Sequence, residues 1–171
     1  NKVLLTSPNK EISNLKNTLS EAVLNSTKKI ELSTFGFDIT HELSQNILSK
    51  LKEGISVTIF CRPRFKTFNN NLSELAKHGA KVFCHPLIHA KSLLIDDKYA
   101  YVFSANFEKH GMDTGFEVGL KLRDSQKTDL QSIYTNWKLT FPYRYFYEKE
   151  LINTDSYKVI DRNKGLLEAI K

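Results

Sequence analysis

Residues 88–122, IHAKSLLIDDKYAYVFSANFEKHGMDTGFEVGLKL, contain two apolar runs separated by a short polar turn, followed by a third run with alternating apolar residues. Such runs are typical of β-strands, and an Asp-rich segment between two of them is typical of a hairpin loop. We therefore expect two paired strands, a loop and a third strand. Five polar side chains would converge on one face of these strands: His89, Lys91, Ser104, Asn106 and Glu117.

The hairpin loop sets the register of the two strands. If residues 97–98 form a two-residue loop, Lys91 lies opposite Ser104 and His89 lies opposite Asn106, with all four side chains on one face. A three-residue loop would break this alignment, so the pairing is a specific prediction about register.

This group of side chains suits attack on phosphorus. A neutral imidazole at His89, held by the carboxylate of Glu117, is a competent nucleophile. The amine of Lys91 and the amide of Asn106 can bind the nonbridging oxygens and stabilise the charge that builds on them. Ser104 can position the phosphate or the lysine. Hard metal ions prefer several carboxylates, so we expect the reaction to need neither a metal ion nor another cofactor.

The spacing of these residues resembles the His-Lys-Asp motif of the phospholipase D superfamily. The matching positions are His89, Lys91, Asp96, Ser104, Asn106 and Glu117. The resemblance implies one repeat of that superfamily's α/β sandwich over about residues 28–137. It also implies a phosphohistidine at His89, with the phosphate bound by Lys91 and Asn106. Asp96 completes the catalytic set, although its place at a strand end favours a structural role.

The chain carries the motif once. None of the other histidines, His41, His78, His85 and His110, is followed two positions later by a lysine. Cleavage needs one group to attack and another to protonate the leaving group, and in this superfamily two histidines fill these roles. The second histidine must come from a homodimer with the site on its twofold axis, or from a second repeat absent from this chain. Single-motif members are typically dimeric nucleases.

The rest of the chain predicts the scaffold. Periodicity and turn residues indicate a strand at 3–6, a helix at about 10–25, a strand at 30–35, a helix capped by Asp38 or Thr40 and ending at Gly54, a strand at 55–61, a short helix ending at Gly79, a strand at 81–84 and a helix after Ser125. This alternation favours an α/β fold with a mixed, mostly parallel sheet and helices on both faces. We expect one domain over residues 1–171, with its core at about 28–137 and a C-terminal extension at 141–171.

The C-terminal extension gives weaker signals. Aromatic residues accompany Arg144 in residues 141–147 and could stack on nucleobases. We favour the alternative that they pack at an edge of the core or in an oligomer contact. Leu166, Leu167 and Ile170 indicate one more helical turn.

The composition bounds the class of partner. The chain has 25 Lys and Arg against 19 Asp and Glu, which gives a net charge of +6 and a pI of about 9.2. This balance favours an anionic partner such as nucleic acid or phospholipid headgroups, although a Lys-rich solvated surface gives the same balance. No apolar run is long enough to span a bilayer, so we expect no integral membrane association and a cytoplasmic location. Cys61 and Cys84 lie in apolar runs, and we interpret them as buried thiols.

Basic residues near the predicted site could guide a nucleic-acid backbone. Arg62 and Arg64 follow the carboxyl end of a predicted parallel strand, where ligands tend to bind. Lys109 follows Asn106 closely. A solvated loop is the alternative for Arg62 and Arg64, whereas Lys109 would line the substrate groove.

The sequence thus predicts a metal-independent endonuclease that acts on nucleic acid, with DNA favoured over RNA, and works as a homodimer or with a second repeat. One alternative is a phospholipid phosphodiesterase or phosphatidyltransferase, which would need an apolar groove or a membrane-binding stretch that the sequence does not show. Another is a nucleic-acid-binding module that kept the fold and lost turnover. Its support is two departures from the motif, Phe103 where the superfamily usually carries Gly and Gly115 where it often carries Asn.

Overall fold

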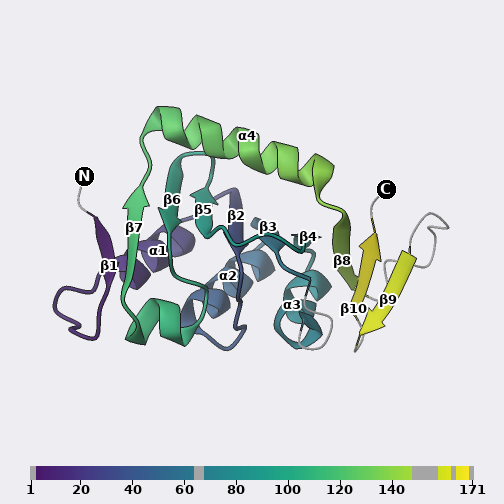
Figure 1. The fold of residues 1–171 in the computed structure, drawn as a ribbon, viewed down its shortest axis with the longest axis horizontal. Coiled ribbons are helices and arrows are strands. Elements are labelled where there is room, and N and C mark those ends of the chain that lie inside the picture. The colour runs from purple at the N-terminus through teal and green to yellow at the C-terminus, as the bar shows by residue number, and fades with distance from the viewer. Residues whose placement is uncertain (1–2, 64–67, 148–157, 163–164, 170–171) are drawn as a thin grey trace.

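The computed structural model describes residues 3–63, 68–147, 158–162 and 165–169 (Figure 1). Its elements, in chain order, are β1 (Leu4–Thr6), α1 (Leu15–Leu24), β2 (Lys29–Thr34), α2 (Glu42–Lys52), β3 (Ser56–Cys61), α3 (Phe68–Lys77), β4 (Lys81–Cys84), β5 (Ser92–Ile95), β6 (Tyr99–Phe103), the π-helix η1 (His110–Thr114), β7 (Glu117–Lys121), α4 (Asp124–Thr140), β8 (Tyr143–Tyr147), β9 (Lys158–Arg162) and β10 (Gly165–Ala169).

All the described strands join one mixed sheet in the order β1-β7-β6-β5-β2-β3-β4-β8-β10-β9. Only the β2–β3 and β3–β4 pairs are parallel, and every other described pair is antiparallel. The predicted mixed α/β sheet is confirmed, but the prediction that it is mostly parallel is wrong. The strand–helix–strand units contribute only β2, β3 and β4, because the other strands enter through hairpins or return connections that reverse direction.

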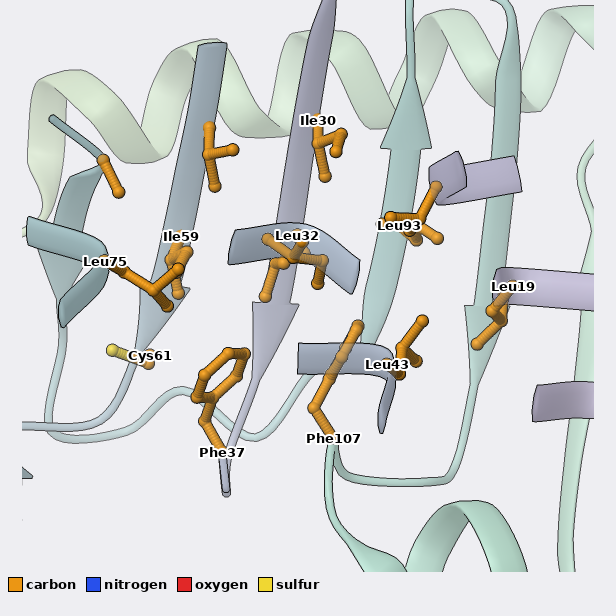
Figure 2. Packing of buried hydrophobic residues seen from close by; sticks show 14 of the residues in the cluster. Leu19, Ile30, Leu32, Phe37, Leu43, Ile59, Cys61, Leu75, Leu93 and Phe107 are labelled. Atoms are coloured by element: carbon orange, nitrogen blue, oxygen red, sulfur yellow. The ribbon is translucent and has the colours of Figure 1, made fainter. Parts of the chain in front are cut away.

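Helices cover both faces of the sheet (Figure 1). On one face, Leu19 of α1, Leu43 of α2 and Leu75 of α3 pack against the strands, and Figure 2 shows these side chains meeting Ile59 and Leu93. On the other face, Leu130 and Tyr134 of α4 pack against Phe60 and Leu94. Neighbouring residues of β3 therefore point to different cores, which explains why this strand is apolar at successive positions.

The start of α2 differs from the prediction. Its N-cap is His41, whose Nδ1 accepts a hydrogen bond from the backbone N–H of Leu43 at 3.1 Å. The predicted cap Asp38 instead accepts from the backbone and hydroxyl of Thr40, in the turn before the helix. The helix ends at Lys52, close to the predicted end at Gly54.

The β5–β6 hairpin has a three-residue loop, so the predicted register is wrong. Ile95 pairs with Tyr99, and the loop begins with Asp96 and Asp97 at φ values of 56° and 55°. Aspartate is among the few residues that tolerate this left-handed conformation. The register shifts by one residue, and Phe103 donates its backbone N–H to the carbonyl of Lys91 at 3.2 Å. The predicted pairs Lys91–Ser104 and His89–Asn106 are therefore not formed.

The C-terminal residues extend the same sheet. β8 pairs with β4 on one side and with β10 on the other. Phe141 and Tyr145 are buried, in agreement with the predicted packing role of this aromatic segment. The prediction of a helical turn is wrong for Leu166 and Leu167, which lie in β10, while Ile170 lies outside the described residues.

Candidate active site

The candidate site lies along the edge of the sheet that is formed by the ends of five neighbouring strands. β5 runs antiparallel to β2, β6 to β5 and β7 to β6. The carboxyl ends of β2, β3 and β6 therefore lie beside the amino ends of β5 and β7. Five predicted residues fall in or next to these ends: His89, Lys91, Ser104, Asn106 and Glu117. The strand directions bring these residues together, so they lie near one another even though the predicted hairpin register was wrong.

His89 and Lys91 form a close pair in the segment before β5. Lys91 Nζ lies 3.0 Å from His89 Nδ1 and 3.3 Å from His89 Nε2. A lysine ammonium has only donors, so the ring nitrogen that accepts from it carries no proton. The His89 side chain is exposed, as a group that meets a macromolecular substrate must be.

Charged groups at the other strand ends influence the pKa of Lys91. Partial burial lowers the pKa of Lys91, and the positive charge of Arg62 acts in the same direction. The carboxylates of Glu117 and Glu108 act in the opposite direction, without overcoming the effect of burial on this pKa. The charges that act on Lys91 therefore come from Arg62 after β3, from Glu117 in β7 and from Glu108 after β6.

Glu117 holds Ser104 in place. The Ser104 hydroxyl donates a hydrogen bond to Glu117 Oε2, and the same hydroxyl accepts from the backbone N–H of Val118 at 3.0 Å. The predicted hydrogen bond from His89 to Glu117 is not among the contacts of the described residues. Glu117 consequently orients Ser104, whereas the His89 imidazole contacts Lys91 and Phe35.

The side chain of Asn106 is oriented by the chain that follows β2. Its Oδ1 accepts from the backbone N–H of Gly36 at 3.1 Å. Because that N–H is a donor, the amide must present Nδ2 on its other side, where it lies 3.4 Å from Glu108 Oε1. An amide donor is thus available at the edge that carries His89.

Arg62 and Phe35 also belong to this edge. Arg62 Nε donates to the carbonyl of Ile88 at 2.8 Å, and its guanidinium lies 4.5 Å from the centre of the Phe35 ring. The Phe35 ring is in turn 5.2 Å from the His89 ring. Arg62 was expected from the sequence, whereas Phe35 was missed. The available signal was its position directly after a parallel strand.

Asp96 lies at the other end of β5, away from these groups. Its carboxylate accepts from the backbone N–H groups of Thr27, Lys28 and Lys29 at 2.8, 2.7 and 2.8 Å. Burial works to raise the pKa of Asp96, but these hydrogen bonds outweigh it and lower the pKa below its usual 3.8. Among the described residues, these contacts tie Asp96 to the segment before β2 and favour a structural role over a catalytic one.

Lys109 lines a cleft that contains none of the other predicted site residues. It precedes η1, and the cleft, of about 580 Å³, is also lined by Lys16, His41 and Asp113. Arg64 lies outside the described residues.

The two departures from the motif are accommodated by neighbouring residues. Phe103 is buried opposite Gly119, where an added Cβ would lie only 2.8 Å from the Phe103 Cβ. At Gly115, an added Cβ would lie 2.6 Å from the carbonyl oxygen of His110, so the turn that ends η1 excludes a side chain there. Phe103 therefore fills space that a glycine on the facing strand provides, as a core residue should.

The cysteines are free and buried, as predicted, with their sulfurs 3.8 Å apart and the pKa of Cys84 raised by burial.

Within the described ranges, no group of three or more His, Cys, Asp or Glu side chains is arranged to hold a metal ion. None of the described helices is both long enough and apolar enough to cross a bilayer.

Comparison with known families decides the classification. The family model described as "Cardiolipin synthase, PLD-like domain" matches residues 19–137, well over half of the chain. The chain belongs to the phospholipase D-like family. The match contains the whole predicted motif, from His89 to Glu117. A sequence search of curated proteins found no match.

Several solved structures share the fold of this chain. NucT from Helicobacter pylori has 20% identity and a TM-score of 0.69, over 81% of this chain and 96% of that one. Nuc from Salmonella typhimurium, a phospholipase D family member, has 16% identity and a TM-score of 0.65, over 81% and 94%. A phosphatidylserine synthase from Haemophilus influenzae has 17% identity and a TM-score of 0.62, over 82% of this chain and 38% of that one. These identities establish the common fold alone.

Proposed function

We propose that this chain is a phosphodiesterase that cleaves nucleic acid, DNA in preference to RNA, through a covalent phosphohistidine at His89. The observation that carries the proposal is the His89–Lys91 pair, which lies at the same sheet edge as the Asn106 amide and the Ser104–Glu117 pair. These side chains supply a nucleophile and donors for the oxygens of a phosphate.

In the first step, an imidazole nitrogen of His89 bonds to phosphorus. The bond from phosphorus to the leaving oxygen breaks, and its electron pair goes to that oxygen, which takes a proton from a second histidine. Water then attacks the phosphohistidine and gives a proton back to the second histidine. The nitrogen–phosphorus bond breaks, which releases a phosphate monoester and regenerates His89.

Lys91 and Asn106 bind the phosphate during both steps. Without substrate, the Lys91 ammonium lies against the His89 ring, and a bound phosphodiester would offer it a charged nonbridging oxygen instead. Asn106 Nδ2 is directed by the Gly36 N–H on its Oδ1 and can donate to another oxygen. The site offers an imidazole, an amine and an amide, with its carboxylate bound by Ser104, so the proposed reaction needs no metal ion.

The second histidine would come from another copy of the chain. Each chain carries a single His-Lys-Asp motif, so a homodimer with two His89 residues facing one phosphate would complete the site. A net charge of +6 favours a polyanionic substrate, and Arg62 at the site edge adds to the local positive charge.

Cleavage in the presence of a chelator tests the proposal. Wild-type protein should cleave plasmid DNA in EDTA, and an acid-quenched reaction should contain a phosphorylated peptide that includes His89. His89→Ala should abolish both signals, and Lys91→Met should slow cleavage by about 100-fold. Lys98→Met is the matched control, because Lys98 is an exposed lysine in the hairpin loop at the other end of β5.

Two results would contradict the proposal. Cleavage that EDTA abolishes and that His89→Ala leaves intact would exclude the phosphohistidine route. Binding of DNA without cleavage, unchanged by His89→Ala, would instead favour a binding module that has lost turnover.

A second candidate function, a phospholipid phosphodiesterase or phosphatidyltransferase, is favoured by two exposed apolar side chains beside the motif. Leu87 and Phe116 are 78% and 80% exposed, close in sequence to His89 and Glu117. Such residues could contact acyl chains at a membrane surface. Release of headgroup from phosphatidylglycerol vesicles, faster than cleavage of DNA and lost in His89→Ala, would support this candidate.

A further inference from the structure

The segment that carries His89 has little regular structure to hold it. Residues 85–91 connect β4 to β5 outside any strand, and the side chain of His89 is exposed. Its hydrogen-bond partner among the described side chains is Lys91, which must turn to the phosphate when substrate binds. Since Glu117 is bound to Ser104, the orientation of the imidazole must come from other contacts.

Two contacts reach His89 from the ends of β2 and β3. Arg62 Nε donates to the carbonyl of Ile88 at 2.8 Å and so fixes the backbone one residue before the imidazole. Phe35 packs on the imidazole itself, with the ring centres 5.2 Å apart and the planes tilted by 50°.

The two contacts are linked to each other. The Arg62 guanidinium carbon lies 4.5 Å from the centre of the Phe35 ring, so one side chain braces both the backbone and the ring that contact His89. A lysine could carry the charge but could not repeat this arrangement, because it lacks the planar guanidinium and its Nε–H.

We propose that Arg62 and Phe35 are positioning residues that set the place and tilt of the His89 imidazole for attack on phosphorus. This inference rests on the proposed function. It changes the role expected for Arg62 from the sequence, where it was a contact to the substrate backbone. It also assigns a role to Phe35.

The test uses the variants Arg62→Lys and Phe35→Leu, with Arg123→Lys as a control remote from the site at the start of α4. A misplaced nucleophile can slow a reaction by about 100-fold, so both variants should lose about 100-fold in kcat on a small chromogenic phosphodiester. The KM should change by less than about threefold, because substrate contacts remain. Phe35→Tyr keeps the aromatic ring and should retain most of the turnover.

A second measurement follows His89 without substrate. The proton NMR signals of the His89 ring, identified by their loss in His89→Ala, should shift in Phe35→Leu because the neighbouring aromatic ring is gone. They should shift in Arg62→Lys as well, while Phe35→Tyr and Arg123→Lys should preserve them. The thermal midpoint of each variant shows whether the fold is intact.

The outcomes separate this inference from the proposed function. Wild-type protein that cleaves no phosphodiester would end the proposed function, and the NMR signals would still judge the positioning role. A rise in KM with unchanged kcat and unchanged His89 signals would make Arg62 a substrate contact and overturn the inference. Unchanged His89 signals in folded Phe35→Leu would overturn it as well.

Discussion

Replacing Asp96 tests whether this residue of the motif acts in the fold or in the chemistry. Its carboxylate accepts the backbone N–H groups of Thr27, Lys28 and Lys29 at 2.7–2.8 Å, and the Thr27 hydroxyl at 3.2 Å. These bonds tie the hairpin loop to the segment that enters β2, at the end of β5 away from His89. We therefore expect Asp96→Ala to lower stability and to leave the turnover of folded protein nearly unchanged.

The magnitude follows from the hydrogen bonds that are lost. Bonds to a charged group contribute about 1.5–3 kcal/mol each, but the exposed N–H groups of Thr27 and Lys28 can regain water, so the lower limit applies and the contributions do not add fully. We expect the free energy of unfolding to fall by about 3 kcal/mol. For a chain of this size, that corresponds to a thermal midpoint lowered by about 6–12 °C.

Urea denaturation and turnover on a chromogenic phosphodiester provide the assay. Asp96→Asn is the matched control, because asparagine tolerates the φ of 56° and keeps one acceptor oxygen, so it should lose less stability. The pKa of Asp96 is lowered in the fold. Its contribution should therefore be complete above its usual pKa of 3.8 and disappear as the pH falls below that value. Asp96→Ala with wild-type stability and no turnover would refute the structural role.

Three further predictions concern the surroundings of the site. Gly119→Ala should lower the free energy of unfolding by about 1–3 kcal/mol because its Cβ meets the Cβ of Phe103, and Phe103→Gly, which removes that atom, should relieve part of this cost in the double variant; urea denaturation checks both. Burial works to raise the pKa of Asp113, but hydrogen bonds from Lys16 and His41 lower it overall, so Asp113→Asn should destabilise the protein above pH 3.8 and lose this effect in acid, as thermal midpoints across pH would show. Asn106→Ala should lower kcat by about 100- to 1,000-fold because it removes a donor to the phosphate, and it should also lower the thermal midpoint because the Gly36 N–H loses its acceptor; turnover and thermal unfolding check the two effects.

That the predicted site residues gather at one edge of the sheet could be foreseen because these residues are close in sequence. The five residues lie within one stretch: His89, Lys91, Ser104, Asn106 and Glu117. Because β5, β6 and β7 alternate in direction, the chain returns these residues to the same edge of the sheet. The contacts among them depend on finer geometry. The hydrogen bond that joins Ser104 to Glu117 follows from how two strands end, which periodicity does not fix.

The errors have identifiable physical causes. The hairpin register was wrong because a two-residue loop was assumed, whereas Asp96 and Asp97 both accept the left-handed conformation of a longer loop. The prediction that the sheet is mostly parallel was wrong. Parallel pairing is expected only for strands joined by crossover helices, and here these are β2, β3 and β4. Phe35 was missed because its neighbours at the site, Arg62 and His89, are distant in sequence.

Mixing wild-type chains with His89→Ala chains tests most directly whether each chain carries half of an active site. The two proteins would be unfolded together in equal amounts, refolded, and assayed on DNA in EDTA. If both histidines of a dimer are needed, only about a quarter of the random dimers are active, and activity per wild-type chain falls to about half. Activity per wild-type chain that stays constant at every mixing ratio would show that one chain holds a complete site, and would contradict the account.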